Sequence, residues 1–174
     1  DGAVDDSHIA ALAASKLTGA LPAISGASLT GFIDAQMPSG SVIQIVSRTT
    51  VSSSGSSSSW AATDAYVAIT PSSTSSKILV ICGGGMIFVN ASDERGFGTI
   101  YRDSTNLGNG NQGLTCGYAG SSNHMTPLAG MTVLDSPSTT SAVTYKVYSK
   151  SGASSPTFNY DTNKIFMIAM EIKG

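Results

Sequence analysis

Charged side chains are scarce in this sequence of 174 residues. Asp, Glu, Lys and Arg together make up 11% of it, against about 25% in typical soluble domains. The formal net charge is −2, and Lys and Arg form no cluster along the chain. Because nucleic-acid binding needs a basic face, we expect no nucleic-acid partner.

Long hydrophobic runs are also missing. No stretch reaches the roughly 18 consecutive apolar residues of a membrane-spanning helix, so we expect a protein that is not inserted in a membrane. The sequence starts at Asp1 without Met and without a signal-peptide pattern. We therefore interpret it as part of a longer polypeptide.

Cysteine and histidine each occur only twice. Cys82 and Cys116 lack the C-x-x-C spacing of metal or redox sites, and we interpret both as small buried apolar residues without a disulfide. This usage suits a chain that folds in a reducing cytoplasm. His8 and His124 lie too far apart in the sequence for a histidine zinc site, so we expect no metal and no cofactor.

Groups suited to catalysis are equally few. No Gly-x-Ser-x-Gly elbow surrounds a nucleophilic serine. Carboxylates that could pair as in a glycosidase are better interpreted as solvated charges in loops and at strand ends; they are Asp93, Glu94, Asp103 and Asp135. The sequence therefore predicts a protein without enzymatic activity.

The first forty residues differ from the rest. Asp5–Ser7 offers a cap for a short helix, and a Leu-Thr-Gly motif at 17–19 recurs at 29–31. Pro22 and interspersed glycines prevent a continuous helix, and a period this short buries no core within one chain. We predict that 1–40 forms a short trimeric stalk in which copies of the chain intertwine. The residues expected to hold this stalk together are Ile9, Leu12, Leu17, Leu21 and Leu29.

Residues 41–174 are predicted to form a head of about eight strands. Short apolar runs alternate with segments rich in Ser, Gly, Asn and Pro, and strands do not alternate with helices. This pattern indicates an all-β fold, an antiparallel β-sandwich or jelly roll. The expected strands are Ser41–Arg48, Ala65–Pro71, Lys77–Val89, Arg95–Asp103, Gly113–Ala119, Leu128–Leu134, Ala142–Lys150 and Lys164–Lys173.

The expected strands are of two kinds. Apolar and polar residues alternate along Ala142–Lys150, which is typical of a strand with one face in water. By contrast, Lys77–Cys82 and Ile165–Met170 are apolar on both faces. A sandwich covers one of these faces, and a monomer would leave the other in water. We therefore predict a homotrimer whose subunits cover the second face through Leu79, Ile81, Phe166 and Ile168.

Three consecutive glycines, Gly83–Gly85, interrupt the longest apolar run. They lack the Gly-Lys-Ser/Thr sequence and the following helix of a phosphate-binding loop. We interpret them as a bulge or turn.

Several strings of the sequence resemble the distal region of tail fibres from tailed bacteriophages. Leu-Thr-Gly-Ala-Leu-Pro-Ala at 17–23 is similar to the short repeats that precede the terminal domains of such fibres. The head is similar to those terminal domains over four stretches, whose order and spacing carry the resemblance: Met37–Gln44, Ile69–Val80, Leu134–Ser141 and Ala169–Gly174.

The resemblance implies a parallel, intertwined homotrimer with a stalk and a β head. It also implies a virion protein that is assembled in the host cytoplasm and that adsorbs to a glycan or an outer-membrane protein of the bacterial surface. It transfers no site residues to this chain.

Exposed loops are the expected place for receptor contacts. The loop at 102–112 is rich in Asn and Gly, and amide groups pair with sugar hydroxyls. The segment 118–124 begins with a tyrosine whose ring can pack against a sugar. The predicted contacts are Trp60, Arg102, Asp103, Asn106, Asn109, Asn111, Tyr118, Asn123 and His124. The simpler alternatives are a plain hairpin turn for the loop and a core position for Trp60.

Two other functions compete with receptor binding. The chain could be a purely structural virion module that trimerises or decorates. It could also be a glycan-cleaving tailspike domain, although such enzymes need a long grooved body with acidic residues and the head has little room for one.

Overall fold

Buried and exposed side chains alternate along the long strands, and this alternation determines the architecture. The computed structural model describes residues 36–51, 57–89, 93–120, 124–127, 130–152, 157–158 and 164–174. In it, β10 (Val143–Ser151) buries every second side chain, and β2 (Ala61–Ile69) does so from Thr63 onward. Because successive side chains point to opposite faces of a strand, such strands build sheets with one inner and one outer face.

The other strands vary in length from two to nine residues. In chain order they are β1 (Val42–Thr50), β3 (Lys77–Gly84), β4 (Met86–Val89), β5 (Glu94–Arg102), β6 (Thr105–Asn106), β7 (Thr115–Ala119), β8 (His124–Pro127), β9 (Met131–Asp135), β11 (Thr157–Phe158) and β12 (Ile165–Ile172).

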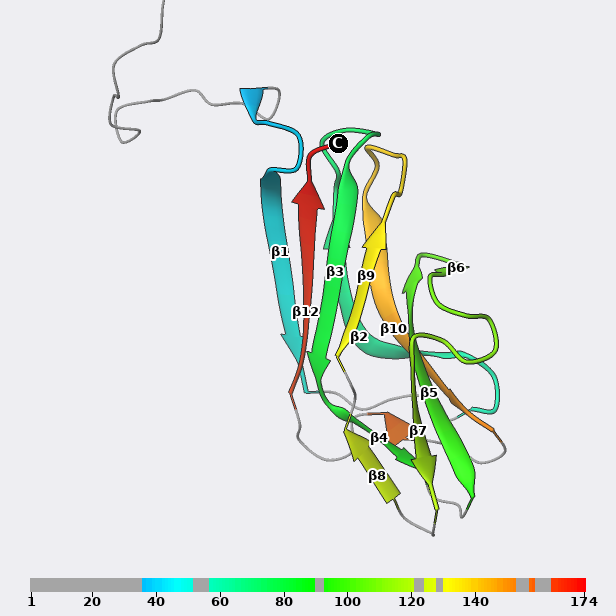
Figure 1. Ribbon diagram of the computed structural model, residues 1–174. Coiled ribbons are helices and arrows are strands. Elements are labelled where there is room, and N and C mark those ends of the chain that lie inside the picture. Colours follow the sequence, from blue (N-terminus) through cyan, green and yellow to red (C-terminus); the bar gives the residue numbers. More distant parts are fainter. Residues whose placement is uncertain are drawn as a thin grey trace, which may run out of the picture. The chain divides into compact units, whose positions relative to one another are not determined.

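The long strands form two antiparallel sheets. The four-stranded sheet has the order β1-β12-β3-β9, and the five-stranded sheet has the order β2-β10-β5-β6 with β7 also paired to β5. In Figure 1 the strands β1, β12, β3 and β9 lie side by side, with β2 and β10 behind them. A small sheet, β11-β4-β8, continues beyond the end of β3. The predicted all-β, sandwich-like fold with antiparallel sheets is confirmed.

The core lies between the two sheets and draws on both. Each large aliphatic side chain that is fully buried there stabilises the fold by about 1.5–3 kcal/mol relative to exposure. The buried apolar residues are Ala65, Val67, Ile69, Ile78, Val80, Cys82, Ile100, Met131, Val143, Tyr145, Val147, Ile165, Met167 and Ala169.

One polar cluster joins the two sheets. Arg102 on β5 donates through Nη1 to both carboxylate oxygens of Asp135 on β9, at 2.8 Å each. The hydroxyl of Tyr145 on β10 donates to Asp135 Oδ2 at 2.8 Å. Burial, and then the nearby carboxylate, raise the pKa of this tyrosine. Since a partly buried, charge-assisted contact of this kind has strict geometry, it fixes how the sheets lie against each other.

At two glycines the longest apolar run passes from one sheet to another. Gly84 and Gly85 have φ angles of +77° and +71°, in the left-handed region that favours glycine. A side chain on Gly84 would also collide with the backbone carbonyl of Lys164. The chain thus turns at Gly84 and Gly85, without a bulge in the pairing of β3, and the single strand expected over Lys77–Val89 is two strands, β3 and β4.

The outer face of the four-stranded sheet is apolar. Strand register places Ile45, Met170, Leu79 and Leu134 in one row across all four strands. Ile45 is 60% exposed and Leu134 is 54% exposed, so nothing in the described part of this chain covers the row. We call this surface the apolar face; its members are Val42, Ile45, Leu79, Ile81, Leu134, Phe166, Ile168, Met170 and Ile172.

The predicted stalk, 1–40, lies almost wholly outside the described residues, and so do Ile9, Leu12, Leu17, Leu21 and Leu29. Its last residues, 36–40, run beside the head. Gly40 donates its backbone N–H to the carbonyl of Lys173 at 2.8 Å. The start of β1 and the end of β12 therefore lie at the same end of the sandwich (Figure 1).

At that end Glu171 is a fully buried carboxylate. It accepts hydrogen bonds from Gln44 Nε2 at 2.6 Å and from the backbone N–H and the hydroxyl of Ser72 at 2.7 Å each. Burial alone would raise the pKa of this carboxyl, but the bonds from Ser76, Gln44 and Ser72 outweigh burial and hold the pKa below its ordinary value. The charge is therefore kept inside the fold by its donors.

We expect Glu171→Gln to lower the free energy of unfolding by about 1–3 kcal/mol, because its amide NH₂ would face an N–H donor, of Gln44 or of Ser72, in either orientation. Since the pKa of Glu171 is lowered on folding, its carboxylate stabilises the head above the ordinary pKa of 4.5, and this stability is lost as the pH falls through the lowered value. Urea unfolding at pH 7 and in acid, at one protein concentration, measures both effects. The variant should depend less on pH in acid, whereas Asp64→Asn, an exposed carboxylate, should behave as the original chain.

Candidate functional site

Aromatic side chains gather on the outer face of the five-stranded sheet. Tyr66 lies on β2, Phe97 and Tyr101 lie on β5, and Tyr148 lies on β10. Each alternates with inward-facing neighbours, so the pleat turns it outward. Trp60, just before β2, reaches the same surface, because a single lysine ammonium lies over both its ring and the ring of Phe97. We call these five residues the aromatic face.

Two rings of this face are stacked. The ring centroids of Tyr101 and Tyr148 lie 4.0 Å apart at an interplanar angle of 26°, an arrangement that stabilises an aromatic pair beyond its buried area. Burial and the neighbouring Tyr148 raise the pKa of Tyr101, and a hydrogen bond with Asn106 opposes this rise. Both phenols thus lie side by side and present a rigid apolar platform with hydroxyl groups attached.

Cationic side chains lie over the other rings. Arg48 of β1 places its guanidinium carbon 3.6 Å from the ring centroid of Tyr66, and the ammonium of Lys146 lies 5.5 Å from the same ring. The ammonium of Lys150 lies 4.8 Å from the Trp60 ring and 5.4 Å from the Phe97 ring. Contacts of this kind are worth about 0.5–1 kcal/mol at exposed positions, so they orient the cations on the face.

A loop rich in Asn and Gly borders this face. Trp60 donates through Nε1 to the carbonyl of Gly110 at 2.8 Å. Gly113 has a φ of +67°, and a side chain on it would collide with the Trp60 ring and with the backbone of β5. Asn106 accepts bonds from the Thr99 hydroxyl at 2.7 Å and from the backbone of the loop at 2.9 Å. The loop is therefore fixed against the edge of the aromatic face.

The structure brings four of the predicted contacts together in this region. They are Trp60, Asn106, Asn109 and Asn111, which lie up to fifty-one positions apart in the sequence. The amide oxygen of Asn109 accepts bonds from the backbone of the next residues and shapes the turn. Asn111 is exposed. The hairpin-turn alternative and the binding prediction are compatible here, because the turn itself presents the amides.

Two predicted contacts on the same loop have internal partners instead. Arg102 faces Asp135 and Tyr145 in the inter-sheet cluster, so its guanidinium is engaged by the fold. Asp103 has a φ of +50° at the turn between β5 and β6, and its Oδ1 accepts the backbone N–H of Thr144 at 3.0 Å. Both side chains stabilise the base of the loop.

The second predicted group lies at the far end of the sandwich. The Tyr118 hydroxyl donates to Asp93 Oδ1 at 2.6 Å, and this bond to a carboxylate raises the pKa of the tyrosine. The ring is 56% exposed. Asn123 and the side chain of His124 lie outside what the structure describes, so the grouping expected around Tyr118 stays a prediction.

Most residues of the aromatic face were not among the predicted contacts. The missing rings are Tyr66, Phe97, Tyr101 and Tyr148, and the cations over them, Lys146 and Lys150, were not predicted either. A signal for part of the set was present, because the alternation along Ala142–Lys150 already places Lys146, Tyr148 and Lys150 on the water-facing side. The pairing of β10 with β2 and β5, which adds the other rings, has no local signal in the sequence.

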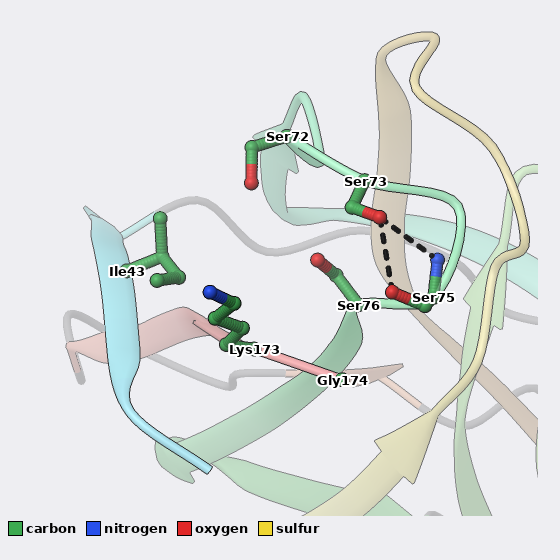
Figure 2. A pocket seen from close by; sticks show the side chains of 7 residues that line it. All are labelled: Ile43, Ser72, Ser73, Ser75, Ser76, Lys173 and Gly174. Carbon is green, nitrogen blue, oxygen red and sulfur yellow. Dashed lines mark hydrogen bonds between the residues drawn. The ribbon is translucent and has the colours of Figure 1, made fainter. Parts of the chain in front are cut away.

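A cavity of about 270 Å³ lies at the other end, beside the entry to β1. Figure 2 shows Lys173 pointing between Ile43 and Ser76, with Ser73 and Ser75 joined by a hydroxyl hydrogen bond. The ammonium of Lys173 donates to the backbone carbonyl of Met37 at 2.6 Å. The polar groups of this cavity thus mainly hold neighbouring segments together, and none of the predicted contacts lines it.

The two cysteines differ, contrary to the expectation that both are buried. Cys82 is buried in the core, and burial raises the pKa of its thiol to about 12. Cys116 is exposed and pairs in register with Phe97 on the outer side of the five-stranded sheet. Both thiols are free, as predicted. Cys116 lies on β7 among small residues, with Tyr118 two positions later. This sequence context does not predict that the thiol is exposed.

We expect a maleimide to react with one thiol per chain in the native protein and with two after denaturation, because only the thiolate attacks and Cys82 is buried with a raised pKa. Mass spectrometry of the labelled chain measures the number. Cys116→Ser should abolish native labelling, and Cys82→Ser should leave it unchanged. Rapid native labelling of Cys82 would contradict the described core.

No known family model matches the sequence, and no curated protein shows significant similarity to it. In the ranges that the structure describes, no helix has the length and apolarity to span a membrane. Among the same residues, no three potential metal-ligating side chains gather in one place.

Proposed function

We propose that this protein is the trimeric head of a tailed-bacteriophage tail fibre and that it binds a glycan of the bacterial surface during adsorption. One observation carries the glycan assignment. Five aromatic rings lie on the outer face of one sheet, beside a fixed loop whose backbone and amides are polar.

This surface matches the two sides of a sugar. The faces of a pyranose ring present C–H groups that pack against aromatic rings, while its hydroxyls need hydrogen-bonding partners at the rim. Trp60, Tyr101 and Tyr148 supply large rigid rings at a low cost in conformational entropy. Asn111 and the neighbouring loop supply amide groups that both donate and accept. An extended face of this kind suits a chain of sugars better than a single buried ligand.

The strand order supports a jelly roll as the specific form of the sandwich. Taken in sequence, the main strands change sheet at every step except from β5 to β7: β1, β3, β9 and β12 belong to the four-stranded sheet, and β2, β5, β7 and β10 belong to the five-stranded one. The two chain-terminal strands, β1 and β12, are neighbours. Eight strands folded in this way make a double Greek key, an architecture frequent in viral proteins.

The apolar face supports the trimer. A surface of nine adjacent apolar residues is larger than the scattered exposure normal for a monomer. β1 forms one edge of this sheet and follows directly on the predicted stalk, so copies joined at the stalk would bring these faces close together. In this arrangement the aromatic face points outward on each subunit, and Leu79, Ile81, Phe166 and Ile168 are covered as predicted.

We expect Ile168→Asp to convert a trimer into monomers that keep the β fold, because the side chain is partly solvated within one chain and becomes a buried, unpaired charge only on assembly. Light scattering should give three times the 17.6 kDa mass of one chain before the change and that single mass after it. Circular dichroism reports the fold, and Ala68→Asp, on the exposed side of β2, serves as the control. A monomeric original chain at micromolar concentration would contradict the trimer.

We expect the protein to bind members of an array of bacterial lipopolysaccharides and capsular polysaccharides, and Tyr148→Ala to weaken this binding about tenfold, the upper effect of one aromatic contact. Tyr148→Phe keeps the ring and should keep most of the affinity. Thr74→Ala, in the exposed turn before β3, should bind as the original chain. An array without any bound glycan would count against receptor recognition and in favour of the structural module, and release of reducing ends would favour the tailspike alternative.

A further inference from the structure

Cationic residues are concentrated on the aromatic face. The chain has nine Lys and Arg residues and a net charge of −2. Four of the nine lie on the outer side of the five-stranded sheet or over its edge: Arg48, Arg95, Lys146 and Lys150. The local charge of this surface is therefore opposite in sign to that of the whole chain.

Carboxylates on the same surface are few, and they leave these cations available. Asp64 on β2 is exposed there, and Asp93 is engaged by the Tyr118 hydroxyl. Among the described residues, neither Lys146 nor Lys150 forms an ion pair with a carboxylate. An ammonium has three N–H donors, so one that lies over a ring keeps donors for solvent or for a ligand.

The spacing of the two lysines fits a repeating anion. Lys146 and Lys150 are four residues apart on one strand and face the same side, so their Cα atoms lie about 13 Å apart. Tyr148 lies between them on that side. A polymer that lies along β10 would meet a cation, a ring platform and a second cation in succession. A neutral sugar chain would use the rings and offer both ammonium groups hydroxyl acceptors, but no opposite charge.

We propose that the aromatic face takes an acidic glycan, a sugar polymer with repeated carboxylate, sulfate or phosphate groups that are bound by Lys146, Lys150, Arg48 and Arg95. The inference rests on the proposed glycan-binding function and specifies its substrate class. Anionic groups form charge-assisted hydrogen bonds with these cations, and the stacked rings bind the sugar faces between them. The cations thus select the acidic groups of the polymer, and the stacked rings select its sugar rings.

Matched polymer pairs test the inference. Polygalacturonate and its fully methyl-esterified form share one backbone and differ in charge, and dextran sulfate and dextran form a second pair. We expect the protein to bind the charged member of a pair at least tenfold more tightly at low salt, and to lose most of this preference at 0.5 M NaCl because salt screens exposed charges. The first pair reports carboxylate recognition, and the second reports sulfate recognition.

Variants locate the effect on the surface. Lys146→Gln combined with Lys150→Gln should remove the preference for the charged polymer, whereas Lys146→Arg combined with Lys150→Arg should keep it. The control, Lys77→Gln with Lys164→Gln, removes two exposed positive charges outside the five-stranded sheet and should have no effect. Maleimide labelling of Cys116, whose strand partner is Phe97, gives an independent readout, since a bound charged polymer should slow it several-fold.

The outcomes separate this inference from the proposed function. Equal binding of both members in each pair, or loss of the preference in the Lys77 and Lys164 control, would overturn the acidic specificity. If neutral glycans on the array still bound through Tyr148, receptor recognition would stand without it. Absence of binding to every polymer and every glycan on the array would overturn both.

Discussion

In a sandwich of two sheets, each sheet buries one face and leaves the other exposed. The candidate binding surfaces of this head follow from that constraint. The pleat sends alternate side chains inward and outward, and the inner sets form a single core. The two outer sets remain, and they differ in chemistry. One is a continuous apolar surface that includes the ring of Phe166, and the other carries aromatic rings with cations over them. In the proposed function, the first surface contacts copies of the chain and the second binds an extended glycan.

Much of the fold was accessible from the sequence because it is encoded locally. Alternation along Ala142–Lys150, and apolar runs without alternation at Lys77–Cys82 and Ile165–Met170, predict β10, β3 and β12 and their exposed apolar sides. Short elements were not predicted, because β6 and β11 contain two residues each and take their conformation from their neighbours. In the segment expected as one strand over Leu128–Leu134, the described residues form β9 from Met131 onward.

The site was less accessible because its parts meet only through tertiary pairing. Trp60 and the loop at 102–112 were recognised separately, and the bond from Trp60 to Gly110 that joins them spans fifty positions. Arg102 illustrates the opposite case: it lies in a polar loop sequence, yet strand register turns it toward Asp135 on the other sheet. Glu171 is similar, since four donors from distant segments make a buried carboxylate tolerable at a position that looks like an ordinary polar strand end.

Substitutions in the inter-sheet cluster are expected to act on the fold before they act on binding. Arg102, Asp135 and Tyr145 tie together strands that carry the loop and the rings, although none of the three belongs to the platform. Replacing any of them would shift the loop and the sheet at once, so a loss of glycan binding in such a variant would report damaged architecture. Under the proposed function, glycan preference can vary more freely at Asn111 or Tyr66, where a new side chain meets solvent and leaves the framework in place.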